Sequence, residues 1–238
     1  MTRSRTATKR SAQPYVPADA GLEDLRRTAN DCRGCDLYRD ATQAVVSSGP
    51  VDAPVVMVGE QPGDQEDRKG EPFVGPAGGV LARALAQVGI PPERAYLTNA
   101  VKHFKFYTRG SKRRLHDTPN RTEILACRPW LRAEFGLLRP AVVVALGATA
   151  AQALAGPSFR VTRHRGELMD WPEAAEHPDD YPRPDPPAHF VATVHPSAVL
   201  RADDRDAAFA EFVADLEVVA SAIRSVGSSR GRGRRRAA

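Results

Sequence analysis

The sequence predicts an α/β protein, a three-layer α/β/α sandwich around a central, mainly parallel sheet of four strands. Two observations lead to this fold class. Four short runs of residues are β-branched and nearly continuous in apolar side chains, as strands covered on both faces are. Segments long enough to form helices separate these runs, and strands that alternate with helices at such lengths are typical of this sandwich.

The elements follow one another in a regular order. Each predicted strand is a short apolar run, such as Ala141-Val-Val-Val-Ala-Leu146. The predicted strands comprise residues 54–58, 95–98, 141–146 and 190–194. The predicted helices comprise residues 79–88, 122–138 and 148–155, and a last helix runs from residue 196 or 197 to residue 223.

The composition fits one globular domain between two tails. The 238 residues are 42% hydrophobic and 26% charged, which suits a chain with a full core. We assign residues 21–223 to the domain, and residues 1–20 and 224–238 to disordered tails. No apolar run approaches the roughly 20 residues of a membrane span, and the charged N-terminus has no apolar segment behind it. We therefore expect a monomeric, cytoplasmic protein that does not contact a membrane.

The net charge of +5 is unevenly distributed along the chain. Residues 1–10 and 224–238 together hold ten basic residues and no acid, which leaves 24 basic against 29 acidic residues between them. Both tails are polar and poor in large apolar residues, so they cannot bury enough surface to order themselves. Such tails commonly follow a phosphate backbone, although a role in solubility is an equally good interpretation.

One segment inside the domain is also basic. Residues 101–121 hold seven lysines and arginines and a single acid, Asp117, and they include the run Lys112-Arg-Arg-Leu-His116. A cationic run can hold a phosphate backbone while its terminal imidazole attacks a group attached to that backbone. A solvated surface loop is the alternative interpretation of the same residues.

Polar residues follow three of the four predicted strands. Gly59-Glu-Gln-Pro-Gly-Asp64 follows the first strand, Asn99 the second and His195-Pro-Ser197 the fourth. Ligands of open α/β sheets bind beyond the carboxyl ends of the strands, so the three segments predict one crevice. Each segment taken singly also has a structural explanation, as a tight turn, a turn residue or a helix cap.

The three cysteines form a second group of candidate ligands. Cys32-Arg-Gly-Cys35 has a spacing that lets two thiolates bind one metal centre, and Cys127 supplies a third. His103 is a plausible fourth ligand, because imidazole replaces thiolate in some iron–sulfur sites. The spacing leaves an iron–sulfur cluster, a zinc site and metal-free thiols as alternatives.

Several ordered motifs together resemble the uracil-DNA glycosylase superfamily, and specifically its iron–sulfur branch, family 4. The resemblance covers about residues 22 to 222, and it implies the fold of that superfamily. The motifs are Cys32-x-x-Cys35, Gly59-Glu-Gln-Pro-Gly63, Pro72-Phe-Val-Gly-Pro-Ala-Gly78, Thr98-Asn-Ala-Val-Lys102, Cys127-Arg-Pro-Trp130, Leu146-Gly147 and His195-Pro-Ser197.

Two departures from the family pattern indicate a narrower subgroup. Lys102-His103 stands where ordinary family-4 enzymes have Lys-Cys. The run that ends at His116 resembles the Lys-Arg-Arg-Ile-His insertion of the UdgX proteins, which look like glycosylases that become trapped on their substrate. The resemblance also implies a 4Fe–4S cluster, held by Cys32, Cys35, Cys127 and His103, with zinc as the alternative.

The resemblance further implies a pocket for uracil. A uracil must be flipped out of a duplex, or be single-stranded already, before a pocket can bind it. Phe73 would then stack on the ring, Asn99 would pair with its O4 and N3–H, and His195 would donate to O2 as negative charge develops there. Glu60, Gln61 and Asp64 are candidates for orienting and electrostatic roles in catalysis, and Gln61 also for contact with uracil.

The main functional hypothesis is that His116 takes the place of water in a base-excision reaction. It would bond to the deoxyribose after uracil leaves as the free base, so that the protein acts once and stays bound to DNA. The phosphates would be held by Lys112, Arg113, Arg114 and Ser197. Two alternatives remain: a conventional glycosylase with water as nucleophile and multiple turnovers, and a non-catalytic binding module for uracil-containing or single-stranded DNA.

Overall fold

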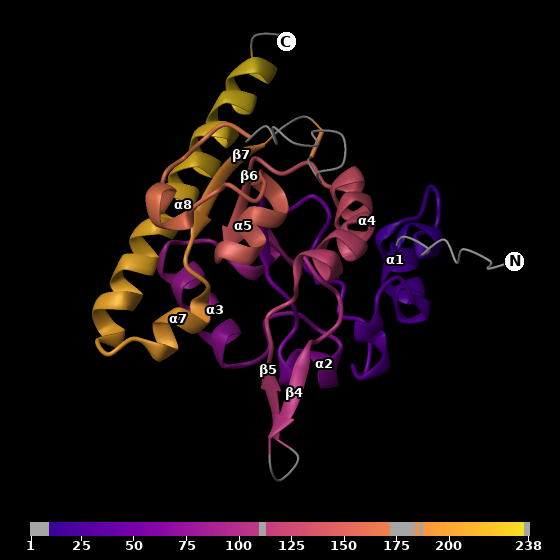
Figure 1. Ribbon diagram of the computed structural model, residues 1–238. Coiled ribbons are helices and arrows are strands. Elements are labelled where there is room, and N and C mark those ends of the chain that lie inside the picture. Colours follow the sequence, from indigo (N-terminus) through magenta and orange to yellow (C-terminus); the bar gives the residue numbers. More distant parts are fainter. Residues whose placement is uncertain (1–9, 110–112, 172–183, 186–187, 236–238) are drawn as a thin grey trace, which may run out of the picture.

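The computed structural model describes residues 10–109, 113–171, 184–185 and 188–235. Its centre is a five-stranded sheet in the order β1-β3-β2-β6-β7 (Figure 1). The strands are β1 (Ser47–Ser48), β2 (Val55–Gly59), β3 (Ala95–Asn99), β6 (Val142–Leu146) and β7 (His189–Thr193).

The sheet is mainly parallel, as predicted. Neighbouring strands among β3, β2, β6 and β7 run parallel, and the pairing of Gly59 with Asn99 aligns the ends of β2 and β3. These four strands correspond to the four predicted ones. The fifth strand, β1, pairs antiparallel with the edge of β3. It was not predicted, because two serines carry no strand pattern of their own.

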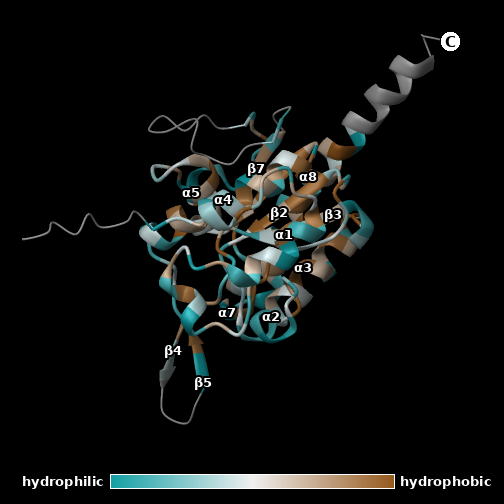
Figure 2. Ribbon diagram, turned by 90° about the vertical axis from the view of Figure 1, so that its right-hand side faces the viewer, coloured by the Kyte–Doolittle hydropathy of each residue, from teal (hydrophilic) through white to brown (hydrophobic). Residues whose placement is uncertain are grey.

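Helices cover both faces of the sheet, which confirms the three-layer sandwich (Figure 1). Alternate residues of β2 enter two different cores: Val55 and Met57 face one, and Val56 and Val58 the other. The first core is closed by α3 (Pro76–Gln87), α7 (Pro196–Arg201) and α8 (Arg205–Arg235), and the second by α4 (Arg121–Leu137) and α5 (Ala148–Ala155). Figure 2 shows the corresponding hydrophobic colouring of the central strands.

The last predicted helix is wrong in two respects. The chain is extended at Ala202, and Asp204 caps a new helix by accepting a hydrogen bond from the backbone N–H of Ala207 (2.9 Å). Helix α8 then continues to Arg235, beyond the predicted end at residue 223, so most of the segment from residue 224 is helical in this structure. Extending a formed helix avoids the cost of nucleating a new one. Residues 236–238 lie outside the described part.

The N-terminal segment is also more ordered than expected from residue 10 onward. Ala12 is buried, and its N–H donates to the carbonyl of Ala126 (2.7 Å). A Cβ atom at Gly34 would lie 2.6 Å from the nitrogen of Ala12, so the glycine between the two cysteines allows this close approach. Residues 1–9 of the predicted tail lie outside the described part.

Short helices complete this region and the connections. The N-terminal part contains η1 (Gln13–Tyr15), α1 (Leu22–Thr28), η2 (Ala29–Asp31) and η3 (Asp36–Arg39). The connections contain α2 (Asp64–Lys69), η4 (Pro92–Arg94) and α6 (Val161–His164). Among the described residues, no helix is both long enough and apolar enough to cross a membrane.

The basic segment forms a β-hairpin. Strands β4 (Phe106–Arg109) and β5 (Arg113–His116) pair antiparallel, with Phe106 opposite His116, and extend away from the central sheet (Figure 1). The sequence indicated a loop here, because the basic residues hide the strand pattern. Of the run that ends at His116, Lys112 lies outside the described residues.

Candidate functional site

The carboxyl ends of β2 and β3 bring two predicted uracil-binding residues together. A Cβ atom at Gly59 would lie 2.3 Å from Asn99 Oδ1 and 2.8 Å from Phe73 Cζ. Asn99 is buried, and its strand is fixed beside β2 by the parallel ladder. Glycine at position 59 therefore leaves the space in which the amide and the aromatic ring meet.

Phe73 is held in an unusual backbone conformation. Its φ is 58°, which is rare for a residue with a bulky side chain. A Cβ atom at Gly78 would lie 1.7 Å from the carbonyl oxygen of Phe73, so only glycine fits there. Glu66 secures the surrounding loops by accepting hydrogen bonds from the N–H groups of Gly63 (3.1 Å) and Gly75 (2.7 Å). Such enforced geometry is common at binding sites.

His195 lies beside Phe73 as a neutral imidazole with a defined tautomer. The two rings stack at a centroid distance of 6.4 Å. The backbone N–H of Ser197 donates to Nδ1 (3.2 Å), which places the ring proton on Nε2. Burial lowers the pKa of His195 to about 4, and the charges of His116 and Arg201 act in the same direction. The ring is therefore an uncharged N–H donor at neutral pH.

Ser197 was predicted to contact DNA, and in the structure it supports His195. Its hydroxyl lies 2.8 Å from His195 Nδ1 and accepts a hydrogen bond from Arg201 Nη1 (2.9 Å). Opposite this contact, Gly147 has a φ of +93°, and a Cβ atom there would lie 3.1 Å from His195 Cβ. The imidazole is thus fixed between the ends of β6 and β7.

His116 approaches the site from the hairpin and meets Glu60. Its Nε2 lies 3.3 Å from Glu60 Oε1, and its side chain is 49% exposed. The other carboxylate oxygen of Glu60 accepts a hydrogen bond from the hydroxyl of Thr149. The ring of Phe104 lies 6.2 Å from that of His116. Thr149 and Phe104 were not singled out from the sequence, where nothing marks them as part of a site.

The side chain of Gln61, predicted to take part in catalysis and in uracil binding, contacts the base of the hairpin in this structure. The buried amide Nε2 donates to the carbonyls of Lys105 (3.1 Å) and Asp117 (3.0 Å). Its Oε1 accepts a hydrogen bond from the N–H of Lys105 (2.9 Å). Both ends of the amide are engaged by the backbone at the base of the hairpin, so Gln61 joins the hairpin to the loop that carries Glu60.

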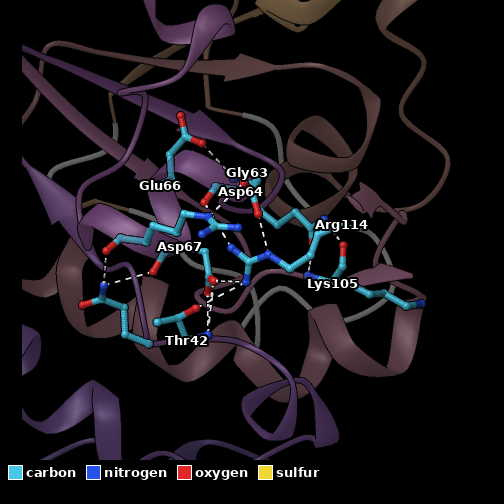
Figure 3. Close-up of polar contacts among 10 residues, drawn as sticks. Thr42, Gly63, Asp64, Glu66, Asp67, Lys105 and Arg114 are labelled. Atoms are coloured by element: carbon cyan, nitrogen blue, oxygen red, sulfur yellow. Dashed lines mark hydrogen bonds and ion pairs between the residues drawn. The ribbon is translucent and has the colours of Figure 1, made fainter. Parts of the chain in front are cut away.

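Asp64 and Arg114, predicted to act in catalysis and in DNA binding, form ion pairs within the protein. The Arg114 guanidinium bridges Asp64 and Asp67, with 2.6 Å from Nη1 to Asp67 Oδ2 (Figure 3). Asp67 is fully buried and also accepts a hydrogen bond from the N–H of Thr42 (2.9 Å). The side chain of Arg114 is only 13% exposed. Arg114 therefore joins the hairpin to α2, and the Asp64 carboxylate, whose side chain is 39% exposed, also pairs with Arg68.

Two lysines of the basic segment, residues 101–121, also form hydrogen bonds or ion pairs within the protein. Lys102 is fully buried, and its Nζ donates to Thr98 Oγ1 (2.7 Å), to the carbonyl of Asn99 (2.8 Å) and to Glu134. Lys105 lies 3.2 Å from Glu123. The outer surface of the hairpin is less basic than the residue count indicates.

Lys102 is a residue whose role the sequence did not reveal. Through the carbonyl of Asn99 it supports the residue predicted to bind uracil, and its own N–H donates to Cys127 Sγ (3.2 Å). The one clue lies in its partner, because Glu134 is an acidic residue on an otherwise apolar helix face.

Three of the four predicted metal ligands are cysteines that lie close together, and the fourth is a histidine. Cys32, Cys35 and Cys127 are buried in one hydrophobic cluster, and Trp130 Nε1 donates to Cys32 Sγ (3.3 Å). Burial raises the pKa of Cys127 to about 12 and lowers that of His103 to about 4. Within the described ranges, no group of three or more His, Cys, Asp or Glu residues is arranged to hold a metal ion.

The chemistry of these four residues is compatible with an iron–sulfur cluster. Buried thiolates need a neutralising centre, and the donors to Cys127 and Cys32 resemble the hydrogen bonds that tune cluster sulfurs. A neutral, buried His103 could act as a ligand, although no hydrogen bond among the described residues joins it to the cysteines.

Comparison with known proteins connects this geometry to a family. The sequence model of the uracil DNA glycosylase superfamily matches residues 46–217. The chain is 35% identical over 181 residues to the Type-4 uracil-DNA glycosylase of Thermotoga maritima, which covers 76% of this chain and 83% of that protein.

Two further relatives carry the same description. The identity is 38% over 133 residues with the Type-4 uracil-DNA glycosylase of Pyrobaculum aerophilum, covering 56% of this chain and 64% of that one. With the Type-4 uracil-DNA glycosylase of Archaeoglobus fulgidus, the identity is 40% over 131 residues, which cover 55% of this chain and 62% of that protein. Since the family match spans most of the sheet and the strand ends at which the polar residues meet, the chain belongs to the uracil DNA glycosylase superfamily.

Proposed function

We propose that this protein recognises uracil in DNA, cleaves its N-glycosidic bond and becomes covalently linked to the deoxyribose through His116. The relatives described as Type-4 uracil-DNA glycosylases support excision of uracil. The observation that carries the covalent step is the position of His116 Nε2, 3.3 Å from Glu60 at the edge of the sheet where Asn99, Phe73 and His195 meet.

Recognition of uracil rests on Asn99 and Phe73. An amide can donate to O4 and accept from N3–H, which is the pattern of uracil, whereas cytosine presents the reverse. A buried polar group facing the wrong base would stay unpaired, at a cost of about 1–3 kcal/mol. Phe73 supplies an aromatic face for stacking. Single-stranded DNA is the preferred substrate in this proposal, because its bases need no unpairing.

Cleavage rests on His195. As the bond from C1′ to uracil N1 breaks, its electron pair leaves with uracil and positive charge develops on the sugar. The Nε2–H of neutral His195 donates to O2 of the departing base, where it stabilises the transition state more than the ground state. The Glu60 carboxylate stabilises the sugar cation electrostatically.

Capture rests on His116. The Nε2 proton, which faces Glu60, passes to that carboxylate, and Nδ1 holds the proton that stays on the ring, so the Nε2 lone pair becomes free. Nε2 donates this pair to C1′ and forms the new C–N bond, and the resulting imidazolium loses its Nδ1 proton to water. The product is a neutral, alkylated imidazole attached to an abasic deoxyribose. No leaving group comparable to uracil remains at C1′, so the protein stays on the DNA.

The DNA surface in this proposal is the outer side of the hairpin. Arg113 is exposed on β5, and Tyr107 is 52% exposed on β4. Tyr107 is opposite Leu115 and Arg113 is two residues from Leu115, so both side chains lie on one face of the hairpin, where they suit a base and a phosphate of single-stranded DNA. The role proposed for Lys112 in phosphate binding falls outside the described residues.

We further propose that Cys32, Cys35, Cys127 and His103 hold a 4Fe–4S cluster, as the resemblance to the iron–sulfur branch implies. The cluster would supply a structural cross-link between the N-terminal segment, the residues after β3 and helix α4. Lys102 would then contact the uracil site and the cluster site together, through Asn99 and Cys127.

The test is to mix the purified protein with a labelled single-stranded oligonucleotide that contains one uracil, beside a thymine control, and to separate the products on a denaturing gel. A boiling-resistant band that forms only with uracil supports capture. Alkali-labile DNA without such a band would show a conventional glycosylase, and bound DNA with intact uracil would show a binding module.

A further inference from the structure

Each oxygen of the Glu60 carboxylate has its own partner. Oε2 accepts a hydrogen bond from the hydroxyl of Thr149, and Oε1 lies 3.3 Å from Nε2 of His116. Thr149 belongs to the first turn of α5, which begins directly after β6. Since β2 and β6 are adjacent parallel strands, their C-terminal continuations bring Glu60 and Thr149 together.

We propose that Thr149 is a positioning residue. By orienting Glu60, it determines which fraction of the sugar cation reacts with His116 and which fraction reacts with water. The inference rests on the capture function proposed above. By holding Oε2, the hydroxyl fixes the carboxylate with Oε1 toward His116. The carboxylate is then oriented for the nucleophile and is hindered from turning toward a competing water molecule.

Both competing reactions need a carboxylate oxygen of Glu60 as a base. In hydrolysis, a water oxygen bonds to C1′ while a carboxylate oxygen accepts one of the water's protons. In capture, the Nε2 proton of His116, which faces Oε1, passes to that oxygen and frees the Nε2 lone pair, and Nε2 then bonds to C1′. A carboxylate with Oε2 bound to Thr149 and Oε1 facing His116 therefore favours capture over attack by water.

The experiment compares Thr149→Val, which keeps the shape of the side chain without the hydroxyl, with Thr149→Ser, which keeps the hydroxyl. Thr162→Val, on the exposed face of α6, is the matched control for loss of a threonine hydroxyl elsewhere. Each protein is mixed in excess with the uracil oligonucleotide. Released uracil, covalent adduct and unattached abasic DNA are then quantified from the same reaction.

We expect Thr149→Val to raise the ratio of unattached abasic DNA to adduct by about tenfold, the scale of one hydrogen bond to a charged group. Thr149→Ser and Thr162→Val should keep the ratio of the unaltered protein. A purely structural defect would lower uracil release and adduct in the same proportion, and that result, or an unchanged ratio, would overturn the inference. Uracil release by the unaltered protein without any adduct would instead overturn the capture function itself.

Discussion

At the scale of single residues, the chemistry depends on an imidazole that stays neutral. Histidine titrates near pH 6.5 in solution, but burial lowers the pKa of His195 to about 4. Because the folded pKa is depressed, the ring remains an uncharged donor throughout the range in which exposed histidines gain a proton. The role proposed for His195 at O2 of uracil should therefore be insensitive to mild acid.

This property predicts the pH dependence of base release. With saturating protein, the single-turnover rate of uracil release by the His116→Ser variant should show no loss with a midpoint near pH 6.5, because burial, the main cause of the lowered pKa of His195, remains in this variant. The rate is measured as free uracil between about pH 5 and 8. A fall through pH 6.5 would mean that His195 titrates as an exposed histidine does.

The same variant tests the nucleophile. His116→Ser removes the imidazole beside Glu60 and leaves room for water, so adduct formation should be abolished while uracil release continues. His164→Ser, which alters an exposed histidine on α6, is the matched control and should keep the adduct. An adduct that persists in His116→Ser would remove His116 from the mechanism.

At the scale of the elements, the hairpin is positioned by contacts that point inward. Gln61 binds the backbone at its base, and Arg114 joins β5 to two carboxylates of α2. His116, the proposed nucleophile, is the last residue of the strand that Arg114 secures. Arg113 and Arg114 both look like DNA contacts in the sequence, but they lie on opposite faces of β5. Arg114 faces α2 and has partners there, whereas Arg113 is exposed.

Alanine substitution of the two adjacent arginines of β5, Arg113 and Arg114, should affect different properties of the protein. Arg114→Ala leaves the buried Asp67 without its cation, so it should lower the unfolding free energy by about 3 kcal/mol and slow capture even at saturating DNA. Arg113→Ala removes an exposed charge, so it should keep stability and capture rate but reduce the salt dependence of DNA binding by about one unit in slope. Thermal unfolding, single-turnover capture and binding at several salt concentrations separate the two. Equal effects on affinity with no loss of stability would contradict the anchoring role of Arg114.

At the scale of the whole molecule, the thiols connect the N-terminal segment to the core. Cys32 and Cys35 share one hydrophobic cluster with Ala12 and with Cys127 of α4. A cluster bound by these residues would stabilise the folded state because the unfolded chain lacks the assembled site.

We therefore expect purified protein to be brown, with bound iron and broad visible absorbance. Cys127→Ala should lose the colour together with part of the thermal stability. Ser225→Ala, at an exposed position on α8, should change neither. Colourless protein with stoichiometric zinc would replace the iron–sulfur proposal with the zinc alternative.

The sequence predicted the parts of the fold that local patterns encode. Strands β2, β3, β6 and β7 are buried on both faces, so their apolar runs mark them within about a residue. Asn99 and His195 were found because they follow such strands. The hairpin, the break after α7 and the packing of Ala12 escaped prediction, because they depend on contacts with distant residues.

The roles of individual site residues were harder to predict than their positions. Gln61, Asp64 and Arg114 have side chains suited to catalysis or DNA binding, and they were assigned on that basis. The structure gives each of them partners within the protein. Residue type limits what a side chain can do, and only the three-dimensional neighbours decide which of those roles it takes.

The central claim is that His116 forms the bond to DNA, and peptide mapping of the cross-linked product tests it most directly. The adduct formed with a short uracil oligonucleotide would be digested with protease and nuclease and analysed by tandem mass spectrometry. We predict a deoxyribose-derived mass on His116 and loss of the mass of uracil from the oligonucleotide. A modification on any other residue, or an adduct that retains uracil, would contradict the account.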